Sequence, residues 1–128
     1  FYDMTWKVSS ESDRIGYRCK GEKLLQFIDR KPPFGAGSNP SNIVDAPYPV
    51  GSIQIPGGKE PIILHRDSVS GGGYAMIATV ISADMDLIGQ LQPNYTMKFK
   101  AVSIDEALAA RKEYQHKVKT LFDLFDAN

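Results

Sequence analysis

Between residues 49 and 82 the chain reads PVGSIQIPGGKEPIILHRDSVSGGGYAMIATVIS. Three short apolar runs occupy positions 50–55, 61–65 and 75–82 of this stretch, and glycine, proline and polar residues separate them. Runs of this length, bounded by turn-forming residues, are typical of β-strands. The stretch therefore predicts a domain that is mainly β.

The strand pattern continues on both sides of this stretch. Residues 2–8 alternate apolar and polar side chains, which is the period of a half-buried strand, and residues 15–19 repeat the alternation after a polar turn. We expect these two runs to pair as a hairpin and a further strand to form over 95–102. Residues 29–49 contain five prolines and little periodicity, so we expect a long loop there, either functional or a surface excursion.

Two helices complete the predicted fold, which is mainly β with helices, an α+β fold. A short helix is expected over 83–91, with Ser82 capping its free backbone donors. A long amphipathic helix is expected over 104–124, because apolar residues recur there at spacings of three and four. Ser103 and Glu106 form a capping box at its start. The apolar stripe of this helix covers either the core or a partner domain.

The composition bounds the class of protein. The chain has 128 residues, enough for one domain, and fifteen basic residues balance fifteen acidic ones. This balance gives the chain no excess of positive charge with which to bind nucleic acid or an anionic membrane. No apolar run approaches the roughly 20 residues of a membrane span, and the start does not resemble a signal peptide. The single cysteine, Cys19, fits a reducing compartment, so we expect a soluble, cytoplasmic protein.

Two histidines are the obvious candidates for acid–base chemistry. His65 follows an apolar run and precedes Asp67, so its side chain is expected to emerge at a strand end. There it acts either as a general acid, base or substrate hydrogen-bonding group, or as a structural histidine satisfied by a carbonyl or by Asp67. His116 has no second ligand at helical spacing, so we expect a surface histidine and no metal site. The sequence also lacks a Walker loop and a nucleophile elbow.

Glycine clusters are the most suggestive feature of the stretch quoted above. Consecutive glycines permit positive φ and expose N–H groups to a carboxylate or carbonyl oxygen. We expect Gly57 and Gly58 to form a turn and the triplet 71–73 to face a ligand. Arg14, at a strand edge, either presents its guanidinium to an anionic group or pairs with Asp13 or Glu11.

Six motifs in a fixed order carry a more specific signal. They are SDRIGYR at 12–18, GSIQIP at 51–56, PIIL at 61–64, GGY at 72–74, IATVISAD at 77–84, and Gln90 with Pro93. In this order they resemble the allophanate hydrolase subunit 2 family. That family includes the carboxyltransferase domain of urea carboxylase and urea amidolyase, and the second subunit of the ATP-dependent 5-oxoprolinase. The stretch 39–48 is most similar to the urea carboxylase branch.

The resemblance implies a cyclophilin-like β-barrel half, and it implies that residues 1–128 are a single domain from the C-terminal part of a longer carboxyltransferase-like protein. The reaction is then either carboxyl transfer from carboxybiotin to a urea-like nitrogen or ATP-dependent opening of a cyclic amide. Both act on a small amide. The implied partners are the missing N-terminal half and a companion subunit or biotin carrier. Carboxybiotin would lie on a partner domain, or ATP on a partner subunit, and this domain would bind no cofactor itself.

The predicted site is one wall of a pocket for such an amide. The family commonly has Gln-Thr-Thr before Gly-Gly-Tyr, whereas this chain has Val69-Ser70-Gly71, and we assign no catalytic base. An alternative function is a non-catalytic interaction module, similar to antagonists of a sporulation-kinase inhibitor. The predicted substrate-binding residues are Arg14, Gly51, Ser52, Gln54, His65, Asp67, Ser70, Gly72, Gly73 and Tyr74.

Overall fold

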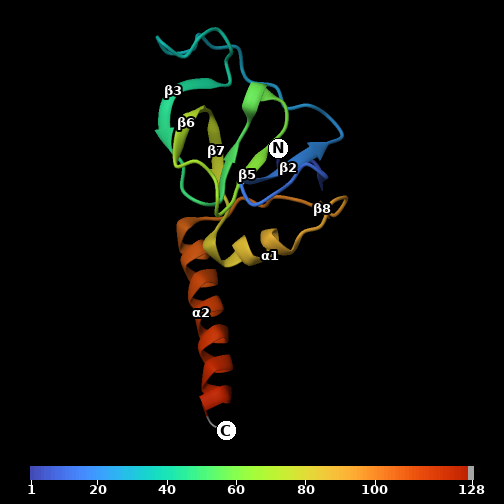
Figure 1. The fold of residues 1–128 in the computed structure, drawn as a ribbon. Coiled ribbons are helices and arrows are strands. Elements are labelled where there is room, and N and C mark those ends of the chain that lie inside the picture. Colours follow the sequence, from blue (N-terminus) through green and yellow to red (C-terminus); the bar gives the residue numbers. More distant parts are fainter. Residues whose placement is uncertain (127–128) are drawn as a thin grey trace.

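Strands dominate the computed structural model, which describes residues 1–126 (Figure 1). The predicted α+β class is confirmed, with two helices joined to two sheets. The strands are β1 (Trp6–Val8), β2 (Gly16–Gly21), β3 (Asn42–Pro47), β4 (Ser52–Gln54), β5 (Ile62–Leu64), β6 (Gly71–Tyr74), β7 (Met76–Thr79) and β8 (Thr96–Met97). The helices are α1 (Met85–Gln90) and α2 (Ile104–Asp126), with 3₁₀ turns η1 (Pro56–Gly58) and η2 (Ser82–Asp84).

The larger sheet has six antiparallel strands in the order β7-β4-β5-β2-β1-β8. The predicted hairpin of the first two strands is confirmed, with Trp6 opposite Gly21 and Val8 opposite Cys19. Within residues 1–126, β7 and β8 are the two edges of this sheet, so it does not close into a barrel. The cyclophilin-like barrel is therefore not confirmed.

A second sheet of two strands corrects two expectations. The segment 29–49, expected to be a loop, contains β3, and the glycine triplet, expected to be an open ligand loop, forms most of β6. β3 pairs antiparallel with β6, with Asn42 opposite Tyr74 and Ala46 opposite Gly72. Prolines flank and end β3, and since proline is unfavourable in strands, the sequence pattern does not predict a strand there. Tertiary pairing outweighs the low strand propensity of glycine in β6.

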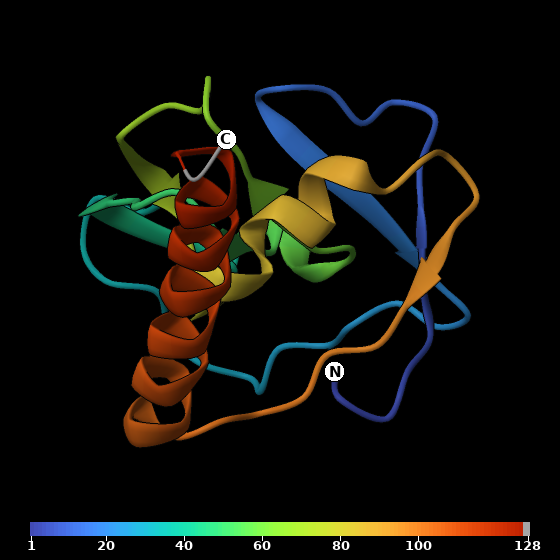
Figure 2. The same cartoon turned by 90° about the horizontal axis from the view of Figure 1, so that it is seen from below.

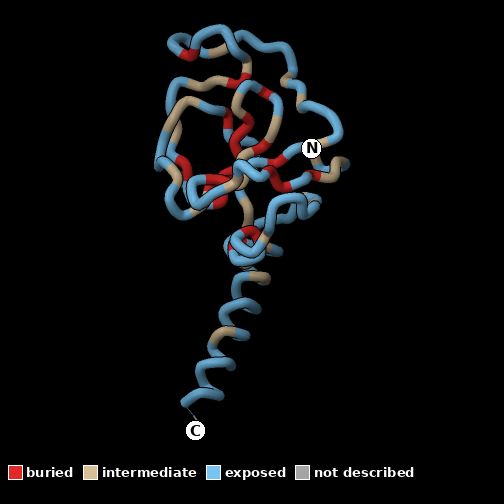
Figure 3. The backbone as a smooth tube through the Cα atoms, turned by 45° about the vertical axis from the view of Figure 1, so that its right-hand side comes forward, coloured by how far each residue is buried: buried red, intermediate tan, exposed pale blue. Residues whose placement is uncertain are grey.

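Apolar side chains from the larger sheet form the core. Trp6, Cys19 and Ile63 are fully buried, and Ile53 and Ile55 are almost fully buried. Figure 3 shows buried segments concentrated in the strands, whereas the long helix is mostly exposed. The core therefore lies within the sheet assembly and does not depend on α2.

Both helices lie on the same side of the sheets (Figures 1 and 2). The short helix forms over η2 and α1, close to the expected 83–91, but the prediction that Ser82 caps it was wrong, because Ser82 is itself the first residue of η2 and no side-chain cap is present. The expected strand over 95–102 shrinks to β8, where only two residues pair with β1.

The long helix α2 and its capping box are confirmed. Ser103 N–H donates to Glu106 Oε2 at 2.6 Å, and Glu106 N–H donates to Ser103 Oγ at 3.2 Å. The first half of α2 contacts η2, and the helix then projects away from the sheets (Figure 1). No helix within residues 1–126 is both long and apolar enough to cross a membrane.

Candidate functional site

His65 lies directly after β5, at a strand end as expected. The backbone N–H of His65 donates to the carbonyl oxygen of Ile15 at 3.0 Å. This bond holds the backbone of His65 beside the start of β2. Its ring lies 5.5 Å from the ring of Tyr17. The Nδ1 atom is buried and has no hydrogen-bond partner among the described residues. The structural role considered from the sequence requires a hydrogen bond from the ring to a carbonyl oxygen or to Asp67. No such bond is present at Nδ1 within residues 1–126.

A cavity of about 340 Å³ opens beside the His65 ring. It is lined by His65, Arg66, Met85, Asp86, Gly89 and Gln90. The guanidinium of Arg66 and the amide of Gln90 provide donors, and the carboxylate of Asp86 provides an acceptor. A small ligand with both N–H and C=O groups can thus be recognised in this cavity.

Helix α1 forms the far wall of the cavity. A side chain at Gly89 would begin 3.5 Å from His65 Nε2, so the absence of one leaves space over the ring. The helix is held at this distance because Tyr17 Oη donates to the Gly89 carbonyl oxygen at 3.2 Å. On the outer side, the hydroxyl of Tyr114 in α2 donates to Asp86 Oδ2. This contact raises the pKa of Tyr114, because the carboxylate accepts a hydrogen bond from the protonated hydroxyl and its negative charge disfavours a phenolate.

Arg14 and Asp67 form a bidentate ion pair at the same end of the sheet as His65. The two side chains meet through Nε–Oδ2 at 3.0 Å and Nη2–Oδ1 at 3.2 Å. Asp67 N–H also donates to the Arg14 carbonyl oxygen at 3.0 Å. The partners considered from the sequence were wrong, because Asp13 instead accepts from the N–H groups of the turn at Ile15. Side-chain exposures of 82% for Arg14 and 46% for Asp67 leave the guanidinium accessible to an anion.

A second group of predicted residues surrounds Tyr48, away from the His65 cavity. The Tyr48 N–H donates to the Ser70 carbonyl oxygen at 2.8 Å, and its hydroxyl lies 2.6 Å from the Gly72 carbonyl oxygen. A Cβ at Gly72 would lie 3.3 Å from the Tyr48 ring, and one at Gly73 would lie 3.1 Å from the Ile43 carbonyl oxygen. None of the glycines 71–73 has a positive φ. These glycines permit close strand and ring packing rather than an open loop.

Three predicted residues around β4 lie in the interior. Gly51 has a φ of +91°, and a Cβ there would lie 3.0 Å from the Val80 carbonyl oxygen. Ser52 is fully buried, and its hydroxyl donates to the Pro49 carbonyl oxygen at 2.6 Å. Gln54 is 5% exposed. This segment supports the sheet that carries His65.

The structure thus brings together Arg14, His65 and Asp67 but leaves Gly72, Gly73 and Tyr74 in a separate sheet, with Ser70 directly before it. Sequence reasoning missed Asp86 and Gly89 as lining residues, since a short amphipathic helix gives no indication of which residue faces a histidine. The turn expected at Gly57 and Gly58 is confirmed as η1. His116 is exposed on α2 as expected, and the described residues contain no cluster of three potential metal ligands.

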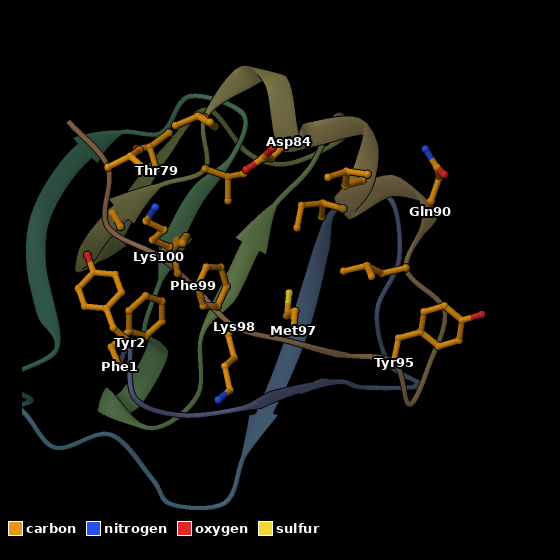
Figure 4. Close-up of a pocket in the computed structure, with 18 residues that line it drawn as sticks. Phe1, Tyr2, Thr79, Asp84, Gln90, Tyr95, Met97, Lys98, Phe99 and Lys100 are labelled. Carbon is orange, nitrogen blue, oxygen red and sulfur yellow. The ribbon is translucent and has the colours of Figure 1, made fainter. Parts of the chain in front are cut away.

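A larger apolar groove of about 680 Å³ lies at the other side of α1 (Figure 4). Phe1 and Phe99 stack in it with ring centroids 4.6 Å apart. None of the ten predicted substrate-binding residues lines it. The groove and the His65 cavity are therefore different surfaces of the domain, although Gln90 borders both.

Comparisons with known proteins agree on one family. The profile of the carboxyltransferase domain, subdomain A and B, matches residues 1–101. The chain is 35% identical over 121 residues to a 5-oxoprolinase subunit of Haemophilus influenzae, covering 92% of this chain and 36% of that protein. It is 31% identical to a putative urea carboxylase of Emericella nidulans, covering 94% of this chain and 9% of that protein. The crystal structure of the K. lactis urea amidolyase superposes with a TM-score of 0.85 at 32% identity, covering 94% of this chain and 7% of that one.

Proposed function

Because the chain belongs to the family of the carboxyltransferase domain, subdomain A and B, we propose that it forms one wall of the amide pocket in a biotin-dependent carboxyltransferase or an ATP-dependent amidolyase. The substrate is a small urea-like or cyclic amide. The relatives are much longer than this chain, which spans 36% of the Haemophilus 5-oxoprolinase subunit and 9% of the putative urea carboxylase. We therefore place residues 1–128 as one domain in the C-terminal part of a longer cytoplasmic protein, whose other half completes a cyclophilin-like barrel.

The observation that carries this proposal is the position of the His65 ring at the wall of a polar cavity. The Nε2 edge of the ring faces Gly89, so an occupant of the cavity would meet Nε2. An amide N–H or a carbonyl oxygen can pair with this nitrogen, depending on the tautomer of the ring. His65 is accordingly the residue that we assign to substrate contact.

The remaining groups of the cavity suit a neutral amide. Donors from Arg66 and Gln90 would polarise a carbonyl oxygen, and the carboxylate of Asp86 would accept from an amide N–H. Arg14, at the edge, would attract a carboxylate such as that of a cyclic amide acid. Carboxybiotin or ATP, held by another domain or subunit, would supply the activated carboxyl or phosphoryl group.

The alternative, a non-catalytic interaction module, is not favoured. The matched relatives are named as an oxoprolinase subunit, a urea carboxylase and a urea amidolyase, which are enzyme names. A concave polar cavity with a histidine in its wall also fits a small ligand better than a flat protein contact.

The test is turnover by the full-length protein with its companion subunits or domains. Urea with bicarbonate, ATP and the biotinylated partner, and 5-oxoproline with ATP, would be assayed separately, since each substrate reports one of the two reaction types. His65→Ala is expected to lower kcat/KM by about 100-fold or more on whichever substrate is turned over. His116→Ala, on an exposed face of α2, is the matched control and should retain activity. Full activity of a folded His65→Ala protein would disprove the site, and turnover of neither substrate would disprove the proposed function.

A further inference from the structure

Two apolar surfaces of this chain take no part in the proposed site. One is the groove of about 680 Å³, whose apolar lining includes Phe1, Leu87, Met97, Phe99 and Val102. Phe1, Phe99 and Met97 lie along one side of it, and Tyr95 stands at its far end (Figure 4). The other is the last part of α2, where Leu121, Phe122 and Phe125 are 57%, 64% and 76% exposed.

The apolar face of α2 is continuous from its packed half to its projecting half. Ala107 and Val118 are partly buried, and Tyr114 contacts Asp86, so this face is covered from the start of the helix to about Val118. Leu121, Phe122 and Phe125 continue the face at spacings of three and four. Beyond about residue 118 the domain no longer covers it (Figure 3). The last turns of α2 thus carry an exposed apolar stripe.

The charges of the two surfaces are complementary. Lys98 and Lys100 line the groove on its β8 side, with Asp84 on the η2 side. Asp123 and Asp126 flank the exposed stripe of α2, and a helix C-terminus also carries partial negative charge. An acidic helix end therefore matches the two lysines of the groove.

We propose that the last turns of α2 from a second copy of this chain dock into the apolar groove, in a reciprocal two-fold dimer. The helix cannot occupy its own groove, because a 23-residue helix is about 35 Å long and projects away from the sheets. A second copy carries both complementary surfaces, so one two-fold contact covers both pairs and closes the assembly.

The size of the contact is sufficient. A fully exposed aromatic side chain removes about 150–250 Å² from water on burial, so Phe122, Phe125 and Leu121 at their remaining exposures, with the covered groove wall, reach roughly 600 Å² in each half of the exchange. Two such halves bury roughly 1,200 Å², the lower end of an ordinary specific interface.

The test is the oligomeric state of the full-length protein, measured by analytical ultracentrifugation over a concentration series. The unsubstituted protein should dimerise, and Phe122→Ser with Phe125→Ser should weaken the dissociation constant by about 100-fold or more. Lys98→Asp with Lys100→Asp should weaken it by about tenfold or more, whereas Lys23→Asp with Lys31→Asp, in an exposed loop, serves as the matched control and should not.

Exchanging the charges of the helix end and the groove tests whether the groove is the surface to which α2 docks. Asp123→Lys with Asp126→Lys should weaken the dimer, and combining it with Lys98→Asp and Lys100→Asp should restore the original dissociation constant. A monomer at all concentrations overturns the proposal. A dimer that needs the phenylalanines but ignores Lys98 and Lys100 overturns it as well, because α2 would then pair with another α2.

Discussion

The hydroxyl of Tyr48 lies 2.6 Å from the carbonyl oxygens of both Gly72 and Tyr74, and it accepts a hydrogen bond from the Tyr74 N–H at 2.9 Å. The hydroxyl of one side chain, directly after β3, thus accepts one hydrogen bond from the backbone of β6 and donates its single proton to one of the two carbonyl oxygens at a time. The glycine at position 72 permits this, because any Cβ would press against the Tyr48 ring at 3.3 Å. The glycine triplet is therefore primarily a packing feature of the small sheet.

Removing the Tyr48 hydroxyl should destabilise the small sheet. Tyr48 is 4% exposed, so Tyr48→Phe leaves partly buried backbone groups of β6 without their partner. We expect a loss of about 1–3 kcal/mol in the free energy of unfolding, measured by urea denaturation. Tyr2→Phe, at a half-exposed tyrosine, is the control and should change it little. Equal stability of Tyr48→Phe and the parent chain would show that water satisfies these groups instead.

The ion pair of Arg14 with Asp67 should matter for ligand binding more than for stability. Both side chains are substantially exposed, and an exposed pair contributes at most about 1 kcal/mol to folding. Arg14→Ala should therefore leave the melting temperature nearly unchanged but raise KM for an anionic substrate by about tenfold or more in the full-length enzyme. Arg111→Ala, on the exposed side of α2, should change neither. A large fall in melting temperature with an unchanged KM would assign Arg14 a structural role.

Cys19 should be inert toward thiol reagents until the domain unfolds. Its side chain is fully buried, and burial, with a smaller contribution from the charge of Glu60, raises the pKa of the thiol from 9.0 to about 12. Thiolate, the reactive form, is thus scarce in the folded chain. Labelling by a maleimide should be complete in denaturant and slow without it, and stability should fall as the pH rises above 9.0. Rapid labelling of the native chain would contradict the packing of β2 against β1.

The sequence indicates the elements of this fold better than their pairing. Alternation in residues 2–8 and 15–19 predicted the β1–β2 hairpin, because the hydrophobic period and the intervening turn are both local features. The pairing of β3 with β6 could not be predicted, since prolines mask one strand and glycines the other. Besides their antiparallel pairing, the hydroxyl of Tyr48 connects them, 24 residues from Gly72 in sequence.

The candidate site shows the same limit. His65 at a strand end could be found from its position after an apolar run, and so could Arg14 at a strand edge. The pairing of Arg14 with Asp67 spans 53 residues and depends on the register of β2 with β5, which no local pattern encodes. Asp86 and Gly89 enter the site only because Tyr17 and Tyr114 hold α1 against His65.

The capping box should make the start of α2 sensitive to acid. Hydrogen bonds with the backbone and hydroxyl of Ser103 lower the pKa of Glu106, so the ionised carboxylate is the form that stabilises the helix. This contribution is complete above the ordinary glutamate pKa and is lost as the pH falls through the lowered value. Glu106→Gln should therefore reduce helicity at neutral pH, measured by circular dichroism, and the difference from the parent should shrink in acid, where Glu106 is itself protonated. A difference that is independent of pH would mean that Glu106 takes no part in the cap.

Replacing Gly89 should raise the stability of the domain and lower the activity of the enzyme. It lies inside α1, where alanine is favoured over glycine by up to about 1 kcal/mol, so Gly89→Ala should raise the melting temperature. The new methyl group would lie 3.5 Å from His65 Nε2 and 3.9 Å from Cε1, within the cavity that we assign to the amide. The same variant should therefore lower kcat/KM of the full-length enzyme, and Gly89→Leu should lower it further by filling the space over the ring. Gln92→Ala, just beyond α1 and outside the cavity lining, is the control and should leave turnover unchanged. A Gly89→Leu enzyme that remains folded and fully active would show that the substrate does not approach His65 from α1.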